Sequence, residues 1–256
     1  MTDEKSGKKK IFNYLLKFWL LWILMLSIVV IFFYGIVNQW FGKMPTFEEL
    51  ENPKSNLASE VYSSDGELLG TYFIENRSNI SYRDISPNLI NALVAIEDIR
   101  FEKHSGIDER ALLRVFYGVV TGNHKGGGST ITQQLAKNLF PRGRLSTPQL
   151  VVRKFQEWIT ALKLERYYSK KEIIAMYLNT VPFGHNSFGI KSASATFFDC
   201  SPDSLNIQQA ALMAGVVNAP TRYSPISNPE RSMQRRNLVL SQMQKYDFIT
   251  KHVYDS

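Results

Sequence analysis

Cysteine is almost absent from this sequence: Cys200 is the single one among 256 residues, and there are only four histidines. An intramolecular disulfide is therefore excluded, and no Cys/His cluster has the spacing of a zinc site. The fold must then depend on a packed hydrophobic core. The composition allows one, because 44% of the residues are hydrophobic and 21% are charged, a globular balance. This length suits one ordinary domain with an appendage, or two small domains.

Charge is missing altogether from residues 18–42, a run of 25 positions. As a helix this run would be roughly 37 Å long, enough to cross a hydrocarbon core of about 30 Å with some tilt. The alternative is a cleaved signal peptide, but its apolar region would be shorter and no small-x-small cleavage site follows Trp40. We therefore expect a transmembrane helix at 18–42.

The tail before this helix, residues 1–17, is rich in lysine. By the positive-inside rule the N-terminus stays in the cytoplasm, and everything after about Lys43 is exported. The formal net charge of +7 favours a polyanion, an anionic membrane surface or a phosphorylated substrate as partner. Nucleic acid is not expected as a partner, because the exported part faces away from the cytoplasm.

The exported region begins with a polar tether at 43–60 and is then mostly helical. An Asp65-Gly66 turn signal between two apolar runs predicts a β-hairpin over 61–73. Apolar periodicity and capping signals predict helices over 86–97, 108–121, 130–138, 149–168, 172–179, 206–217 and 229–246. Residues 61–250 are thus expected to form one mainly α-helical domain.

Acidic residues are also absent between Glu109 and Glu157. A solvated face normally mixes charges of both signs, so this cationic span points to an anionic ligand. Its cations are Arg110, Arg114, Lys125, Lys137, Arg142, Arg144, Arg153 and Lys154. Within it, glycines 126–128 run into Ser129 and a predicted helix, where backbone N–H groups and the helix dipole can attract phosphate. The spacing is not that of a P-loop.

Two glutamates bracket the cationic span. Glu97 ends a predicted helix beside Asp98, where the negative helix end and a like charge favour a proton-accepting role. An exposed, frayed helix end is the plain alternative. Glu157 lies four residues after Arg153, so an ordinary ion pair within one helix is its alternative reading. His104, taken alone, is more typical of a structural cap than of a catalyst or a metal ligand.

Five segments, in order, resemble the signatures of the peptidoglycan glycosyltransferases, the domain of monofunctional transglycosylases and class A penicillin-binding proteins. They are Glu97-Asp98-x-x-Phe101-x-x-His104-x-Gly106, residues 127–134, Arg153-Lys154-x-x-Glu157, Lys170-x-Glu172-Ile173-Ile174-x-x-Tyr177-Leu178-Asn179 and Arg235-Arg236-Asn237-x-Val239-Leu240. The resemblance covers essentially the whole exported region. It implies a lysozyme-like helical fold, with a lobe that dips into the bilayer.

The resemblance also implies a reaction. The reducing-end sugar of a growing lipid-linked glycan strand is joined to the 4-hydroxyl of lipid II, with inversion and loss of undecaprenyl pyrophosphate. Glu97 matches the general base, and Glu157 the second acidic residue near the donor's pyrophosphate, where a divalent cation (Mg²⁺ or Mn²⁺) is expected to assist. The residues matched to substrate and pyrophosphate binding are Ser129, Gln134, Lys137, Arg144, Arg153 and Lys154. Membrane lipid and other wall-synthesis proteins are the further partners implied.

The sequence departs from the family pattern in three places. The stretch 141–149 is longer than the usual loop, which leaves open whether Arg142 or Arg144 is the loop arginine. Gln209 stands where glutamate is frequent, and Asp199-Cys200 replaces a more usual Gly-Lys. None of these positions touches the two proposed catalytic carboxylates.

Two rival functions remain open from the sequence. It is also open whether the chain is a fragment of a longer protein. A lytic glycosidase would suit the same fold and a glutamate acid, but a neutral glycosidic bond needs no cationic pyrophosphate site. An inactive membrane scaffold would need neither carboxylate. No Ser-x-x-Lys lies in the exported region and Lys-Thr-Gly is absent, so transpeptidation is not expected from this chain. Residues 251–256 resemble the start of a class A linker, which favours a fragment of a bifunctional protein over a complete monofunctional enzyme.

Overall fold

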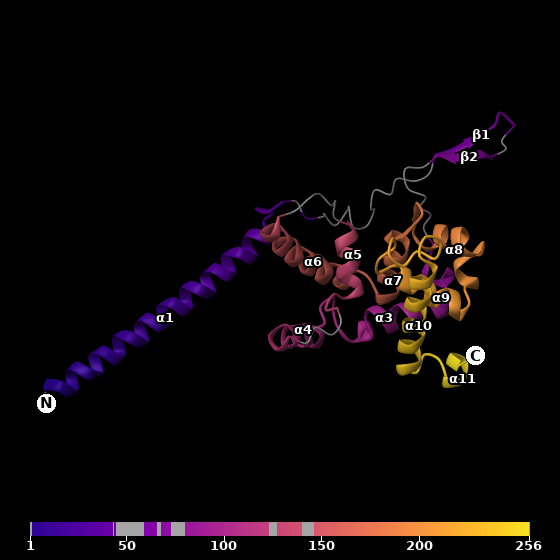
Figure 1. The fold of residues 1–256 in the computed structure, drawn as a ribbon. Helices are drawn as coiled ribbons and strands as arrows, with labels where there is room; N and C mark the ends of the chain where they lie inside the picture. The colour runs from indigo at the N-terminus through magenta and orange to yellow at the C-terminus, as the bar shows by residue number, and fades with distance from the viewer. Residues whose placement is uncertain are drawn as a thin grey trace. The chain divides into compact units, whose positions relative to one another are not determined.

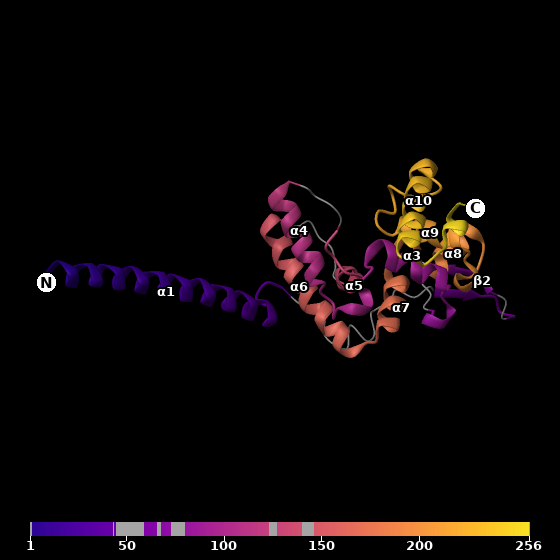
Figure 2. The same cartoon turned by 90° about the horizontal axis from the view of Figure 1, so that it is seen from below.

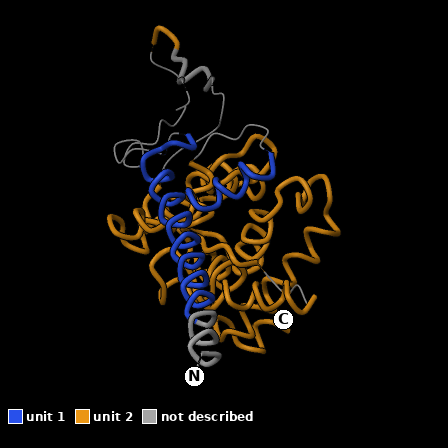
Figure 3. The backbone as a smooth tube through the Cα atoms, turned by 90° about the vertical axis from the view of Figure 1, so that its left-hand side faces the viewer, with its two compact units in different colours: residues 1–44, 145–156 blue, residues 45–144, 157–256 orange. Residues whose placement is uncertain are grey.

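The computed structural model describes residues 2–42, 44, 59–65, 68–72, 80–122, 127–139 and 146–255. The chain divides into two compact units, shown in different colours in Figure 3. The first comprises residues 1–44 and 145–156, and the second comprises 45–144 and 157–256. Arg144, proposed above as the loop arginine, lies outside the described residues.

The first unit is dominated by α1 (Thr2–Val37), the long helix of Figure 1. Its segment from Phe12 to Val37 is the one described helix long and apolar enough to cross a membrane. The helix includes the basic tail and ends before the uncharged run does, because the chain turns at Gln39, where φ is +62°. The Trp40 N–H then donates back to the Gly35 carbonyl at 2.9 Å. The helix is thus longer at its start and shorter at its end than the predicted 18–42.

The second unit contains the predicted hairpin. Strands β1 (Ser59–Tyr62) and β2 (Leu68–Tyr72) pair antiparallel, with Ser59 opposite Tyr72 and an irregularity between Val61 and Tyr62. A second short pair, β3 (Pro182–Gly184) with β4 (Ser187–Phe188), follows later in the chain. The other elements described in this unit are helices, which confirms the mainly α class.

Three helices distant in sequence form the centre of the second unit. They are α3 (Pro87–Glu97), α9 (Ile207–Val216) and α10 (Pro229–Lys245), and they pack against one another in both views (Figures 1 and 2). Their facing apolar side chains are almost fully buried, among them Leu89, Leu93, Met213, Val239 and Met243. This packing fixes the end of α3, and with it Glu97, against α10.

A second pair of helices, α5 (Ile131–Leu139) and α7 (Lys170–Thr180), packs beside this centre. Helix α7 begins with the predicted capping box: the Ser169 hydroxyl accepts from the Glu172 N–H, and the Glu172 carboxylate accepts from the Ser169 N–H. The other elements are η1 (Tyr82–Asp84), η2 (Phe101–Lys103), α4 (Glu109–Thr121), α6 (Thr147–Tyr167), α8 (Ile190–Phe198), η3 (Pro202–Ser204) and α11 (Lys251–Asp255). The seven helices predicted for the exported region are all present, whereas α8 and α11 were not predicted.

Candidate active site

The Glu97 carboxylate lies at the last residue of α3, and its side chain is only 8% exposed. Gln134, on α5, donates its amide N–H to one carboxylate oxygen at 2.8 Å. Arg235, on α10, donates to the other oxygen at 3.5 Å. Each oxygen therefore has its own donor, and three helices determine where the carboxylate points. A frayed, solvated helix end is not what the chain forms here.

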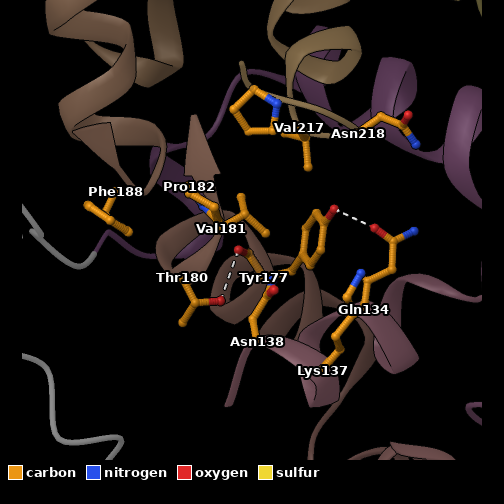
Figure 4. Close-up of a pocket in the computed structure, with 11 residues that line it drawn as sticks. Gln134, Lys137, Asn138, Tyr177, Thr180, Val181, Pro182, Phe188, Val217 and Asn218 are labelled. Carbon is orange, nitrogen blue, oxygen red and sulfur yellow. Dashed lines mark hydrogen bonds between the residues drawn. The ribbon is translucent and has the colours of Figure 1, made fainter. Parts of the chain in front are cut away.

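Tyr177, on α7, orients the amide that holds Glu97. Its hydroxyl donates to the Gln134 side-chain carbonyl at 2.9 Å (Figure 4). This bond leaves the amide NH₂ of Gln134 to donate to Glu97. Burial, and secondarily the negative charge of Glu97, raise the pKa of Tyr177 well above its ordinary value. The phenol therefore remains a neutral donor. The hydrogen bonds from Tyr177 to Gln134 and from Gln134 to Glu97 then keep the same donor-to-acceptor direction.

Asp98, the carboxylate next to Glu97 in the sequence, is hydrogen-bonded to His104 and to the start of α5. Both of its oxygens lie 3.0–3.1 Å from His104 Nε2, and one also accepts the Ile131 N–H at the start of α5 at 3.1 Å. The Gly106 N–H donates to His104 Nδ1, so the ring proton is on Nε2 and is donated to Asp98. Asp98 and His104 are thus structural, as the plain reading of His104 held.

The loop that follows Glu97 is fixed to the helices around it. The Gly106 carbonyl accepts from the Thr130 hydroxyl at 2.7 Å and from the Gln133 amide at 3.2 Å. On the other side, the Lys170 ammonium donates to the His104 carbonyl at 2.6 Å and to Glu165 at 2.8 Å. The first, second and fourth signatures therefore form one hydrogen-bonded frame behind the carboxylate.

Arg235 was quoted above within the fifth signature but was given no site role. The lack of a side chain at Gly215, on α9, makes room for it, because a Cβ there would lie 2.9 Å from Arg235 Cγ. The guanidinium carbon lies 5.4 Å from the centroid of the Tyr223 ring. Its contact with Glu97 spans 138 positions of sequence, and no local pattern could have indicated it.

A pocket of about 330 Å³ opens beside Gln134 and Tyr177 (Figure 4). Lys137 and Asn138, one turn further along α5, line it, as do Val217 and Asn218 after α9. The size lies at the lower end of the range for small-molecule sites. Of the predicted site residues, the structure brings together Glu97 and Gln134 by a hydrogen bond, and Gln134 and Lys137 on this pocket.

The other predicted site residues lie on neighbouring elements. Ser129 is half-buried, two residues before α5. Glu157, on α6, is 7% exposed, so its carboxylate is not a solvated surface group. Arg153 and Lys154, on the preceding turn of the same helix, belong to the first unit. Their roles, and that of Glu157, stay predictions.

Comparison with known proteins decides the family. The family model for transglycosylases ("Transglycosylase") matches residues 65–244. The chain belongs to the transglycosylase family. The match includes all five signatures quoted above, and with them Glu97, Gln134, Glu157, Tyr177 and Arg235.

Relatives of this transglycosylase include several proteins named penicillin-binding protein 1A. The one from Aquifex aeolicus is 39% identical over 90% of this chain and 32% of its own length. Those from Pseudomonas aeruginosa and Escherichia coli are 34% and 32% identical, over 94% and 87% of this chain and 29% and 26% of their own lengths. A crystal structure of penicillin-binding protein 1A from Haemophilus influenzae aligns with a TM-score of 0.44 at 23% identity, covering 79% of this chain and 20% of that one. The chain therefore spans about a third or less of the relatives it matches.

Proposed function

We propose that this transglycosylase polymerises lipid II into peptidoglycan glycan strands for bacterial cell wall synthesis. It would transfer the reducing-end sugar of a growing lipid-linked strand to the 4-hydroxyl of lipid II, with inversion and release of undecaprenyl pyrophosphate. The observation that carries the proposal is the Glu97 carboxylate, nearly buried and held by donors from two other helices. A general base needs this kind of fixed position near the proton that it removes.

Glu97 would take the proton from the acceptor hydroxyl as the new glycosidic bond forms. Gln134 and Arg235 keep the carboxylate aimed, and Tyr177 keeps the Gln134 amide in the orientation that donates. In this arrangement the carboxylate does not have to be ordered during the reaction, which lowers the entropic part of the barrier.

The leaving group would be stabilised by cations from the second and third signatures. Lys137 lines the pocket beside Gln134 and is the cation best placed to meet a donor pyrophosphate there. Ser129, Arg153 and Lys154 would add hydrogen bonds and charge, and Arg144 is the proposed contribution of the loop.

Glu157 would hold a divalent cation, Mg²⁺ or Mn²⁺, together with the donor pyrophosphate. The described residues contain no group of three or more His, Cys, Asp or Glu side chains that could hold a metal alone, so substrate phosphates and water would have to complete the coordination. Mg²⁺ is commonly bound through one or two carboxylates, substrate phosphates and waters. Such a cation, when bound, would neutralise charge that develops on the departing pyrophosphate.

Helix α1 would anchor the enzyme in the bacterial inner membrane as a single pass, with the N-terminus in the cytoplasm and the catalytic domain outside. Its apolar length and the lysines before it support this orientation. An anchor confines the enzyme to the layer that holds both lipid-linked substrates and so raises their effective concentration.

The decisive experiment is to incubate the purified chain with lipid II and Mg²⁺ and to compare it with a Glu97→Gln variant. We expect wild-type protein to lengthen glycan strands and the variant to lose about 10²–10⁴-fold in rate, the usual contribution of a general base. Glu102→Gln, at an exposed position on η2, is the matched control and should polymerise normally. Undiminished polymerisation by Glu97→Gln would refute the base assignment. Shortened polymer in place of lengthened strands would indicate a lytic glycosidase.

A further inference from the structure

A second cavity, of about 230 Å³, lies between the segment that follows α9 and the first half of α10. It is lined by Arg222, Tyr223, Arg231, Gln234, Arg235 and Leu238. The four residues from α10 have the spacing i, i+3, i+4 and i+7, so they share one face of that helix. The cavity is therefore formed by one helix face and a covering loop, and no acidic residue is among the described residues that line it.

The described lining carries three guanidinium groups and no carboxylate, although one of the three, Arg235, is paired with Glu97 outside the cavity at 3.5 Å. Arg222 and Arg235 both lie over the Tyr223 ring, at 5.6 and 5.4 Å from its centroid, so two like charges converge on one aromatic side chain. The buried Nε of Arg235 has no hydrogen-bond partner among the residues that the structure describes. A buried donor without a partner is costly, and like charges repel. A bound anion would offset the repulsion between the guanidinium groups.

Arg235 connects this cavity to the catalytic carboxylate. It donates to one oxygen of Glu97, while Gln134, which lines the first pocket, donates to the other. Each of the two cavities therefore reaches Glu97 through its own donor. An inverting transfer requires two substrates bound at one base, and the pocket with Lys137 is the one assigned above to the donor pyrophosphate.

We propose that the arginine-lined cavity binds an anionic oxygen group, phosphate or carboxylate, of the acceptor substrate. This inference rests on the proposed function. Lipid II offers that chemistry from two sources, its pyrophosphate and the carboxylates of its peptide, and arginine can bind either in a bidentate manner. As Glu97 takes the acceptor's proton it loses its charge, and Arg235 is then free to interact more strongly with the bound anion. Acceptor binding and proton transfer are thereby coupled through one side chain.

The test is steady-state polymerisation by an Arg222→Gln/Arg231→Gln double variant of the full chain. Both side chains are exposed, and neither contacts Glu97 in the structure, so the fold and the base are left intact. We expect KM for lipid II to rise about tenfold, the loss of one to two charge-assisted hydrogen bonds, with kcat within about twofold. Lys191→Gln/Lys245→Gln, an exposed pair elsewhere in the second unit, removes the same charge and is the matched control. A KM equal to that of this control would overturn the proposal.

Lipid II with amidated peptide carboxylates distinguishes the two sources. If the cavity binds the peptide, the KM for this amidated substrate is already raised with wild-type protein. The double variant then does not raise it further. If it binds phosphate, the double variant raises KM equally for both substrates.

Binding of fluorescent lipid II in the Glu97→Gln background, read by anisotropy, needs no turnover. A wild-type chain that does not polymerise, while the arginine variants still weaken this binding, would refute the proposed function and support the cavity. Binding unchanged by the arginine variants would overturn the cavity itself.

Discussion

At the scale of single residues, the carboxylate of Glu97 depends on a side chain that never touches it. Tyr177 is fully buried and donates to Gln134, which donates to Glu97. Because the pKa of Tyr177 is raised on folding, its ionisation destabilises the folded protein. The folded protein favours the neutral phenol, so this contribution is fully present below pH 10 and is lost as the pH rises from there through the folded-state pKa.

A Tyr177→Phe variant should show this dependence directly. At neutral pH it should cost about 1 kcal/mol of unfolding free energy, because the Gln134 carbonyl loses its donor. Above pH 10 the wild-type protein should lose stability more steeply than the variant, by up to about 1.4 kcal/mol per pH unit. Urea unfolding of both proteins from pH 7 to pH 11 measures the difference. Parallel profiles would show that Tyr177 ionises as freely in the folded chain as in the unfolded one.

The sequence allowed Glu97 and Gln134 to be named in advance, but not the way in which they are held. The pair Glu97-Asp98 suggested like-charge repulsion, but not that Asp98 bonds to His104 and to the start of α5. Arg235 was visible only as part of a signature. Its contact with Glu97 depends on how α3, α9 and α10 pack together. The residues next to Arg235 in the sequence give no indication of that packing.

At the scale of elements, the bend between α3 and α4 depends on Gly106, where two constraints coincide. Its φ is +89°, and a Cβ there would lie 2.9 Å from the backbone of Ala161 on α6. Gly122, which ends α4 at φ +70°, has the same backbone constraint, but no described residue lies within 4 Å of a Cβ built there. A comparison of substitutions at the two glycines therefore separates the effect of backbone strain from the effect of steric crowding.

Alanine substitution at the two glycines should therefore have unequal effects. Gly122→Ala should cost about 1–2 kcal/mol of unfolding free energy, the penalty of a left-handed residue. Gly106→Ala should cost about 1–3 kcal/mol more, the usual cost of overpacking against a rigid backbone. It should also slow polymerisation, because the Gly106 carbonyl and N–H hold Thr130, Gln133 and His104. Equal losses in chemical denaturation of the two variants would contradict this account.

Most of the helices could be predicted because periodicity and caps are local signals, as the capping box at Ser169 and Glu172 illustrates. Helix α8 was missed because its sequence, rich in serine and alanine with two adjacent phenylalanines, has no clear apolar stripe. It ends at Asp199 in a left-handed conformation (φ +49°), a position that usually takes glycine. The departure Asp199-Cys200 noted in the sequence is therefore a replaced helix cap, a property that only the backbone angles reveal.

At the scale of the whole molecule, the chain combines one apolar helix with a catalytic unit that has its own core. The proposed orientation of this helix rests on the lysines of the N-terminal tail. The scarcity of cysteine makes the orientation easy to test, because Cys200 is the single thiol and is partly exposed in the second unit.

In spheroplasts of cells that produce the chain, a membrane-impermeant maleimide should therefore label Cys200 without permeabilisation. A Ser6→Cys/Cys200→Ser variant moves the only thiol into the tail before the apolar helix, and its thiol should be labelled only after detergent is added. The same variant without the Ser6 change is the control for background labelling. Labelling of Ser6→Cys in intact spheroplasts would place the tail outside. The catalytic unit would then face the cytoplasm, which contradicts both the positive-inside argument and the proposed site of wall synthesis.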